Sequence, residues 1–215
     1  MDAVQTAPSF EHVNQQDLEK HLQRANYGRF WLTDAIRPSY ELNVIPTQGF
    51  RHDTVPEPDE SVSLPMPVLM ASVSAPRLFD AFLDLLDPLG DTVDVILESS
   101  HGKSKMKNRQ FLYRDDIDMP VLKSTLMQHE YMILNDGCTG ISVINSQSQY
   151  EVRLDEHKLL LIYARKLTPF EGILIDNYVD CNEQIQFVTE AEHVHCSTVK
   201  FAEEFGELMY DLGAE

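Results

Sequence analysis

The chain has 215 residues, and its composition excludes several classes of protein. Hydrophobic residues make up 43% and aromatic residues 9% of the chain, which is typical of a globular protein with a sizeable core rather than a disordered one. The 35 acidic and 17 basic residues leave a formal net charge of −18, which opposes binding to nucleic acid and to anionic membranes. We therefore expect no nucleic-acid or membrane partner, and we expect the acidity to serve solubility or the binding of a basic protein partner.

The cysteines and the first residues indicate a compartment. Cys138, Cys181 and Cys196 lie far apart in the sequence and show no paired spacing. An odd number of such thiols fits a reducing, intracellular setting. The first residues lack a signal-peptide pattern, and no apolar run reaches the length of a membrane span. These features predict a cytoplasmic protein.

The N-terminal part predicts a short helix followed by an extended arm. Asn14 is a good N-cap residue and begins an amphipathic pattern. The aromatic residues that follow either anchor the arm in the main core or form a ligand platform: Tyr27, Phe30 and Trp31. Six of the 11 prolines then fall within 37–67, which argues against regular structure there. We therefore divide the chain into an N-terminal helix with a proline-rich arm at 1–62 and a main domain at 63–215.

The main domain predicts an α+β fold with a mainly antiparallel sheet of about six strands and packed helices. Apolar or alternating runs predict strands at 68–73, 92–98, 131–134, 141–144, 150–155 and 159–163, the last four as a meander that turns first at Asn135-Asp136-Gly137. Capping and proline signals predict helices that begin near Ser74, Asp118 and Thr168, and a last helix that begins at Ser197 or Thr198. Strand 159–163 is apolar throughout, so we expect both faces to be covered and four side chains to be nearly fully buried: Leu159, Leu160, Leu161 and Ile162.

A basic row stands out between two acidic parts of the chain. Lys103, Lys105, Lys107 and Arg109 alternate in sequence, so an extended segment would turn all four charges to one side. This row is interpreted as an anion-binding or partner-binding site, whose anion is a ligand or a carboxylate of the same or a second chain, or as a solvated loop. The glycine pattern of a phosphate-binding loop is missing because Leu97 stands where the first glycine belongs.

Two other groups of side chains suggest metal chemistry. Asp115 and Asp116 could hold Mg²⁺, or could simply lie next to a helix N-terminus. An extended His193-Val194-His195 would place both imidazoles on one face, and the sequence leaves open whether Cys196 takes part and whether Cys181 or Glu190 completes a transition-metal site. We assign no metal ligand and no cofactor from the sequence.

The sequence supports two functional hypotheses. The favoured one is a non-enzymatic intracellular protein-interaction domain that uses its acidic surface or the basic row. The alternative is a small-molecule or phosphate-ester enzyme that uses the 101–116 loop as an anion clamp, with nearby carboxylates as metal ligands or general base.

Overall fold

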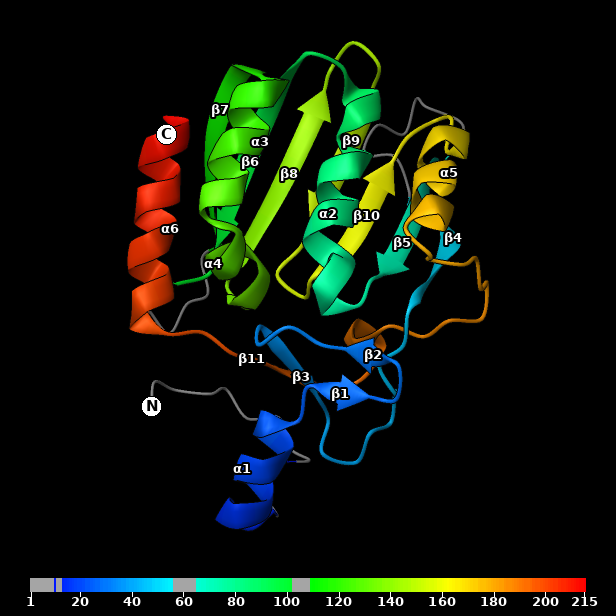
Figure 1. The fold of residues 1–215 in the computed structure, drawn as a ribbon, viewed down its shortest axis with the longest axis vertical. Coiled ribbons are helices and arrows are strands. Elements are labelled where there is room, and N and C mark those ends of the chain that lie inside the picture. The colour runs from blue at the N-terminus through cyan, green and yellow to red at the C-terminus, as the bar shows by residue number, and fades with distance from the viewer. Residues whose placement is uncertain (1–9, 11–12, 56–64, 102–108) are drawn as a thin grey trace.

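The computed structural model describes residues 10, 13–55, 65–101 and 109–215, and it has an α+β fold built on one large antiparallel sheet (Figure 1). The sheet has seven strands in the order β4-β5-β10-β9-β8-β6-β7, so the predicted fold class is confirmed. Its strands are β4 (Gly49–Val55), β5 (Met66–Ser72), β6 (Thr92–Ser99), β7 (Gln110–Asp118), β8 (Thr139–Asn145), β9 (Tyr150–Leu154) and β10 (Leu159–Tyr163).

Helices form a layer on one face of this sheet, where α2, α3 and α5 lie side by side with α6 next to α3 (Figure 1). The helices are α1 (Gln15–Gln23), α2 (Ala75–Leu85), α3 (Met119–Gln128), α4 (Glu130–Asn135), α5 (Thr168–Asp176) and α6 (Val199–Leu212). Their apolar stripes and the inward side chains of the strands form one core between the two layers. None of the helices in the described part of the chain is long and apolar enough to cross a bilayer.

Two short β-ribbons lie below one end of the sheet in Figure 1. One pairs β1 (Asn26–Tyr27) with β2 (Phe30–Trp31), and the other pairs β3 (Ile36–Pro38) with β11 (His193–His195). The second ribbon therefore joins a segment near the start of the chain to one near its end. The predicted division of the chain at residue 62 stays a prediction.

Strand β10 lies near the middle of the sheet, between β5 and β9. Leu160 and Ile162 are fully buried under the helices, and Leu159 is buried on the opposite face against Ile185 and Phe187. Leu161 also points to that opposite face but is only half-buried. The prediction of near-complete burial is therefore confirmed for three of the four side chains and is wrong for Leu161, because the covering segment packs on only part of that face.

The first strand of the predicted meander is wrong, because residues 131–134 lie in helix α4. A run of four apolar residues fits a buried helix turn as well as a strand, and its length did not separate the two. Met132, Ile133 and Leu134 are buried while Tyr131 is 64% exposed, which is the pattern of a helix with one covered side. The meander therefore consists of β8, β9 and β10 only.

Strand β7 was missed in a stretch interpreted as a charged loop and a helix cap. It is an outer strand whose neighbouring strand is β6, and on its other side the backbone of Tyr113 exchanges two hydrogen bonds with Glu215. A bulge at Asp115 and Asp116 breaks its alternation. Asp116 has φ 54° there, and its backbone N–H donates to the Asp94 carboxylate. Strand β4 was likewise missed in the proline-rich arm, where no regular structure was expected.

Candidate metal centre

Three histidines meet at the end of the sheet that faces the β3–β11 ribbon. His157 lies in the turn between β9 and β10, whereas His193 and His195 lie on β11. Their ring centroids are 4.7 to 5.2 Å apart, and each ring offers a nitrogen within 4.8 Å of those of the other two. The predicted pairing of His193 and His195 on one face is thus present, and His157 is the third member of the cluster.

Asp155 fixes the position of His157. One carboxylate oxygen accepts the backbone N–H groups of His157 and Leu159, both at 2.9 Å, which closes the turn as an Asx motif. The other oxygen lies 2.7 Å from Nδ1 of His157. Lys158 takes the left-handed conformation at φ 61°, which reverses the chain into β10. The imidazole is therefore held by the same carboxylate that shapes the hairpin.

Strand alternation places the other two rings. Val194 is buried between them, so His193 and His195 project to the opposite side of β11. The Nδ1 atom of His193 lies 2.8 Å from the carbonyl of Ala191, and that of His195 lies 2.7 Å from the carbonyl of Gly137. Two backbone oxygens thus orient these rings.

Gly137 is the point at which three segments meet. Its N–H donates to the carbonyl of Cys196 at 2.8 Å, and Cys196 N–H donates to the carbonyl of Ala35 at 2.8 Å. A Cβ atom on Gly137 would lie 2.2 Å from the Ala35 oxygen, so only glycine fits. This close approach sets the distance between β11 and the start of β8.

All three rings share one hydrogen-bonding pattern. Each Nδ1 faces an oxygen that can only accept a hydrogen bond, so each Nδ1 carries the proton. The lone pair of each neutral imidazole is then on Nε2, free to bind a metal ion. This arrangement, in which a carboxylate or carbonyl orients a metal-binding histidine from behind, is the usual one around protein-bound zinc.

Burial influences the charges around the cluster. It lowers the pKa of His195, assisted by the neighbouring His157, and so favours the neutral ring. Burial alone would raise the pKa of Asp155, but the hydrogen bond and charge of His157, the Leu159 N–H and the charge of Lys158 together lower it. Burial also lowers the pKa of Lys158 to about 8, against the opposing effect of nearby carboxylates, and its Nζ donates to the carbonyl of Thr139 at 2.7 Å.

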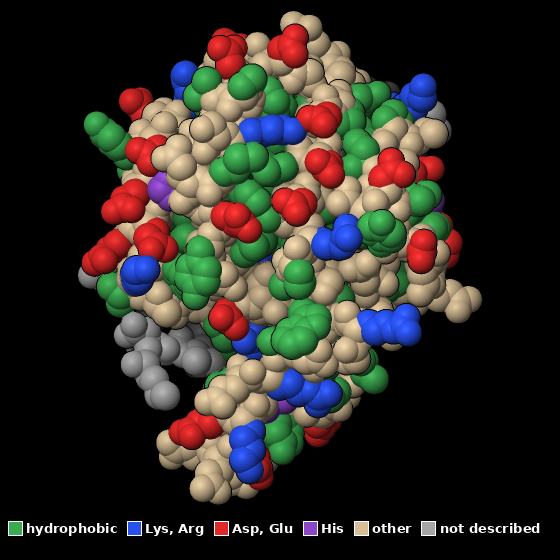
Figure 2. Space-filling model, in the orientation of Figure 1, with side chains coloured by type: hydrophobic (Ala, Val, Ile, Leu, Met, Phe, Trp, Pro, Cys, Tyr) green, Lys and Arg blue, Asp and Glu red, His purple; other side chains and the backbone are tan. Residues whose placement is uncertain are grey.

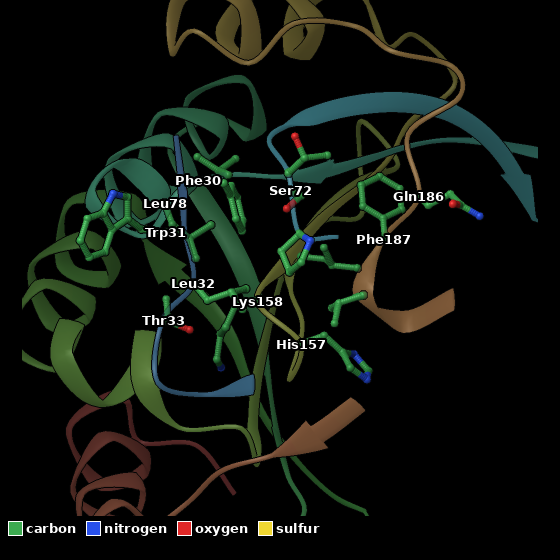
Figure 3. A pocket seen from close by; sticks show the side chains of 15 residues that line it. Phe30, Trp31, Leu32, Thr33, Ser72, Leu78, His157, Lys158, Gln186 and Phe187 are labelled. Atoms are coloured by element: carbon green, nitrogen blue, oxygen red, sulfur yellow. The ribbon is translucent and has the colours of Figure 1, made fainter. Parts of the chain in front are cut away.

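A small hollow of about 20 Å³, partly open to solvent, lies beside the cluster (Figure 3). Its lining is mainly apolar, with Phe30, Leu32 and Phe187 facing Lys158 and His157. The ring of His157 lies next to strand β11 (Figure 3). The hollow and the cluster therefore adjoin at His157.

The other sequence-based candidates are placed elsewhere or remain open. Arg109 forms an ion pair with Glu156, whereas Lys103, Lys105 and Lys107 lie outside the described residues, so the basic row stays a prediction. Asp115 and Asp116 are exposed on the β7 bulge.

None of the partners considered for the histidine pair belongs to the cluster. Glu190 pairs with Arg51, and Cys181 lies against Glu183 on the surface. Cys196 follows His195 on the chain but does not join the three rings. The third ligand was missed because His157 is far away in the sequence, and only the Asp-x-His pattern at the end of a strand marked its position.

Comparisons of the chain with protein-family models, with curated proteins and with solved structures find no match.

Proposed function

We propose that this protein binds a divalent transition-metal ion of the zinc class through Nε2 of His157, His193 and His195. The observation that carries the proposal is the shared pattern of the rings, since all three donate from Nδ1 to fixed oxygens and leave Nε2 as the free donor. Three imidazoles within reach of one another suit zinc, copper, nickel or cobalt better than magnesium or calcium, which prefer oxygen ligands.

The number of ligands favours a catalytic role over a purely structural one. Closed structural zinc sites use four protein ligands, whereas catalytic sites use three and keep one position for water or substrate. An ion held by three histidines would supply a bound water of lowered pKa as the nucleophile for hydrolysis or hydration of a small molecule. The hollow that adjoins His157 offers mainly apolar contacts for part of such a substrate.

This proposal keeps the enzymatic alternative but places the active site at the three histidines instead of the 101–116 loop. The predicted anion clamp at 101–116 stays a prediction, with Arg109 paired to Glu156. The protein-interaction role also stays a prediction, because net charge does not identify a partner. Figure 2 shows acidic side chains spread over the helix face among basic and apolar ones, rather than gathered in one patch.

The test is metal binding by the stripped protein. We expect titration calorimetry with Zn²⁺ to show that His157→Ala, His193→Ala and His195→Ala each remove the same equivalent of tightly bound ion, because each takes away one ligand. His129→Ala is the matched control, since His129 pairs with Asp211 on a helix surface away from β11. Zinc binding that is unchanged in all three variants would refute the proposal.

A further inference from the structure

A second group of metal-binding side chains lies on the other side of the Gly137 turn. Asp136 is fully buried where α4 leads into β8. Thr139 Oγ1 donates to its carboxylate at 2.5 Å, and the backbone N–H of Cys138 donates to it at 3.3 Å. His101, just after the end of β6, brings its Nε2 to 2.9 Å from the same carboxylate. The end of β6 and the segment that leads into β8 thus meet at one buried negative charge.

Two buried polar atoms at this place have no well-formed hydrogen bond among the described residues. One is Nε2 of His101, whose distance to Asp136 is short but whose ring direction does not fit a hydrogen bond. The other is the hydroxyl oxygen of Ser197, which lies against Asp136 and Cys138. Buried polar atoms without partners are rare and ask for an explanation.

The orientation of His101 leaves Nε2 as its free atom. Its Nδ1 lies 2.8 Å from the hydroxyl of Ser99, a group that can accept from or donate to it. If Nδ1 carries the proton, the lone pair of the ring is on Nε2, which is then the atom available to a metal ion. Donor atoms of these three residues lie within 4.8 Å of one another.

We propose that His101, Asp136 and Cys138 form a second metal site, separate from the three-histidine cluster and selective for a thiophilic ion such as Zn²⁺ or Co²⁺. One nitrogen, one oxygen and one sulfur are an accepted donor set for zinc. A cation at this place gives Nε2 a ligand bond in place of its poorly directed contact with Asp136 and offsets the cost of burying the Asp136 charge.

The competing explanation is an ion pair between a protonated His101 and Asp136, with no ion at the site. The two explanations differ at Cys138, because a thiol takes no part in the ion pair but becomes a thiolate ligand when a metal binds. The sulfur therefore provides a signal that neither the ion pair nor the three-histidine cluster can produce.

The experiment is Co²⁺ titration of the metal-free protein, followed by absorption spectroscopy. A thiolate bound to Co²⁺ gives a charge-transfer band in the near ultraviolet, whereas a site of three imidazoles gives only the weaker visible bands. We expect two equivalents of bound Co²⁺ and the near-ultraviolet band in the parent protein. We expect Cys138→Ser to lose the band and one equivalent.

The control variants separate this site from the others. Cys196→Ser removes a similarly half-buried thiol nearby, and Cys181→Ser removes the exposed one, so both should keep the band. His193→Ala should lose the other equivalent and also keep the band. The inference is overturned if the near-ultraviolet band is absent from the parent protein, or if it survives in Cys138→Ser. Neither result decides the three-histidine proposal, which is tested by the equivalent of Co²⁺ that His193→Ala loses.

Discussion

At the scale of single residues, Asp155 combines a structural and a chemical task. One oxygen closes the β9–β10 turn, and the other holds the proton of His157 on Nδ1. The two tasks can be separated, because an asparagine side chain offers one acceptor and one donor in the same shape.

Asp155→Asn should weaken metal binding while keeping the fold. The amide oxygen can still accept the backbone N–H groups of the turn, but the amide NH₂ would then face Nδ1 of His157 and force the proton onto Nε2, where it blocks the metal. We expect the affinity for Zn²⁺ to fall about 10- to 100-fold, the usual effect of losing such a partner, with little change in the thermal midpoint of unfolding. Asp87→Asn, an exposed carboxylate on the far side of the helices, is the matched control. An unchanged affinity in Asp155→Asn would show that this carboxylate does not set the tautomer.

The sequence identified part of this site. The spacing of His193 and His195 predicted two rings on one face, since side-chain alternation is a local property of any strand. It could not identify His157 or the Asp136 cluster, because those contacts depend on which strands pair and how the Gly137 turn packs. Hydrophobic pattern carries no information on that packing.

At the scale of elements, long and regular patterns were interpreted correctly and short or charged ones were not. The apolar stripes of α2 and α6 predicted both helices, and Thr198 caps α6 as expected. The errors fell at α4, which is too short for its period to be recognised, and at β7, which lies at the edge of the sheet and tolerates exposed charges. Sequence periodicity thus fails where an element meets the core along only a small surface.

The outer strand β4 is tied to its surroundings by a histidine between two carboxylates. His52 Nδ1 lies 2.6 Å from the carboxylate of Glu183, and its Nε2 lies 3.1 Å from that of Glu171 on α5. Glu183 follows directly on the segment whose backbone hydrogen-bonds to Phe50 of β4. The hydrogen bonds to Glu171 and Glu183 raise the pKa of His52, and the contact with His52 lowers the pKa of Glu183.

These shifts predict a pH window for stability. Because the pKa of His52 is raised in the folded state, its contacts stabilise the fold fully at pH values below 6.5, the ordinary pKa of histidine. This stabilisation is lost as the pH rises through the raised pKa. Because the pKa of Glu183 is lowered in the folded state, its contact with His52 stabilises the fold at pH values above 4.5, the ordinary pKa of glutamate. This stabilisation is lost as the pH falls through the lowered pKa. His52→Gln should therefore reduce the thermal midpoint most between about pH 4.5 and 6.5, and less at pH 8 and at pH 3. A reduction that is the same at every pH would contradict this account.

At the scale of the whole molecule, the two faces of the sheet are covered unequally. Helices pack over one face (Figure 1), whereas Ile185 and Phe187 pack against Leu159 on the other. Adjacent side chains of β10 lie on different faces of the sheet. Leu160 points into the helix-covered core, and Leu161 points to the opposite side.

Leu160→Ala and Leu161→Ala should differ in their cost. Leu160→Ala leaves a cavity in a closed core and should reduce the free energy of unfolding by about 2–5 kcal/mol. Leu161→Ala should cost clearly less, because its side chain is half-buried and solvent can enter the space that it leaves. Chemical denaturation of both variants gives the comparison, with each serving as the control for the other. Equal losses would mean that the second face is closed as tightly as the first.

The close approach at Gly137 also has a consequence for the order of folding. The Ala35, Gly137 and Cys196 segments touch there through backbone atoms, although they are far apart in the sequence. Contacts of such long separation cost loop-closure entropy, and this cost falls once the intervening chain is ordered, so local pairing is favoured first. The β8–β9–β10 hairpins, which are local, can form first, and β11 docks on them late. The three histidines then come together only in a nearly completed chain, so ion uptake follows folding of the sheet rather than guiding it.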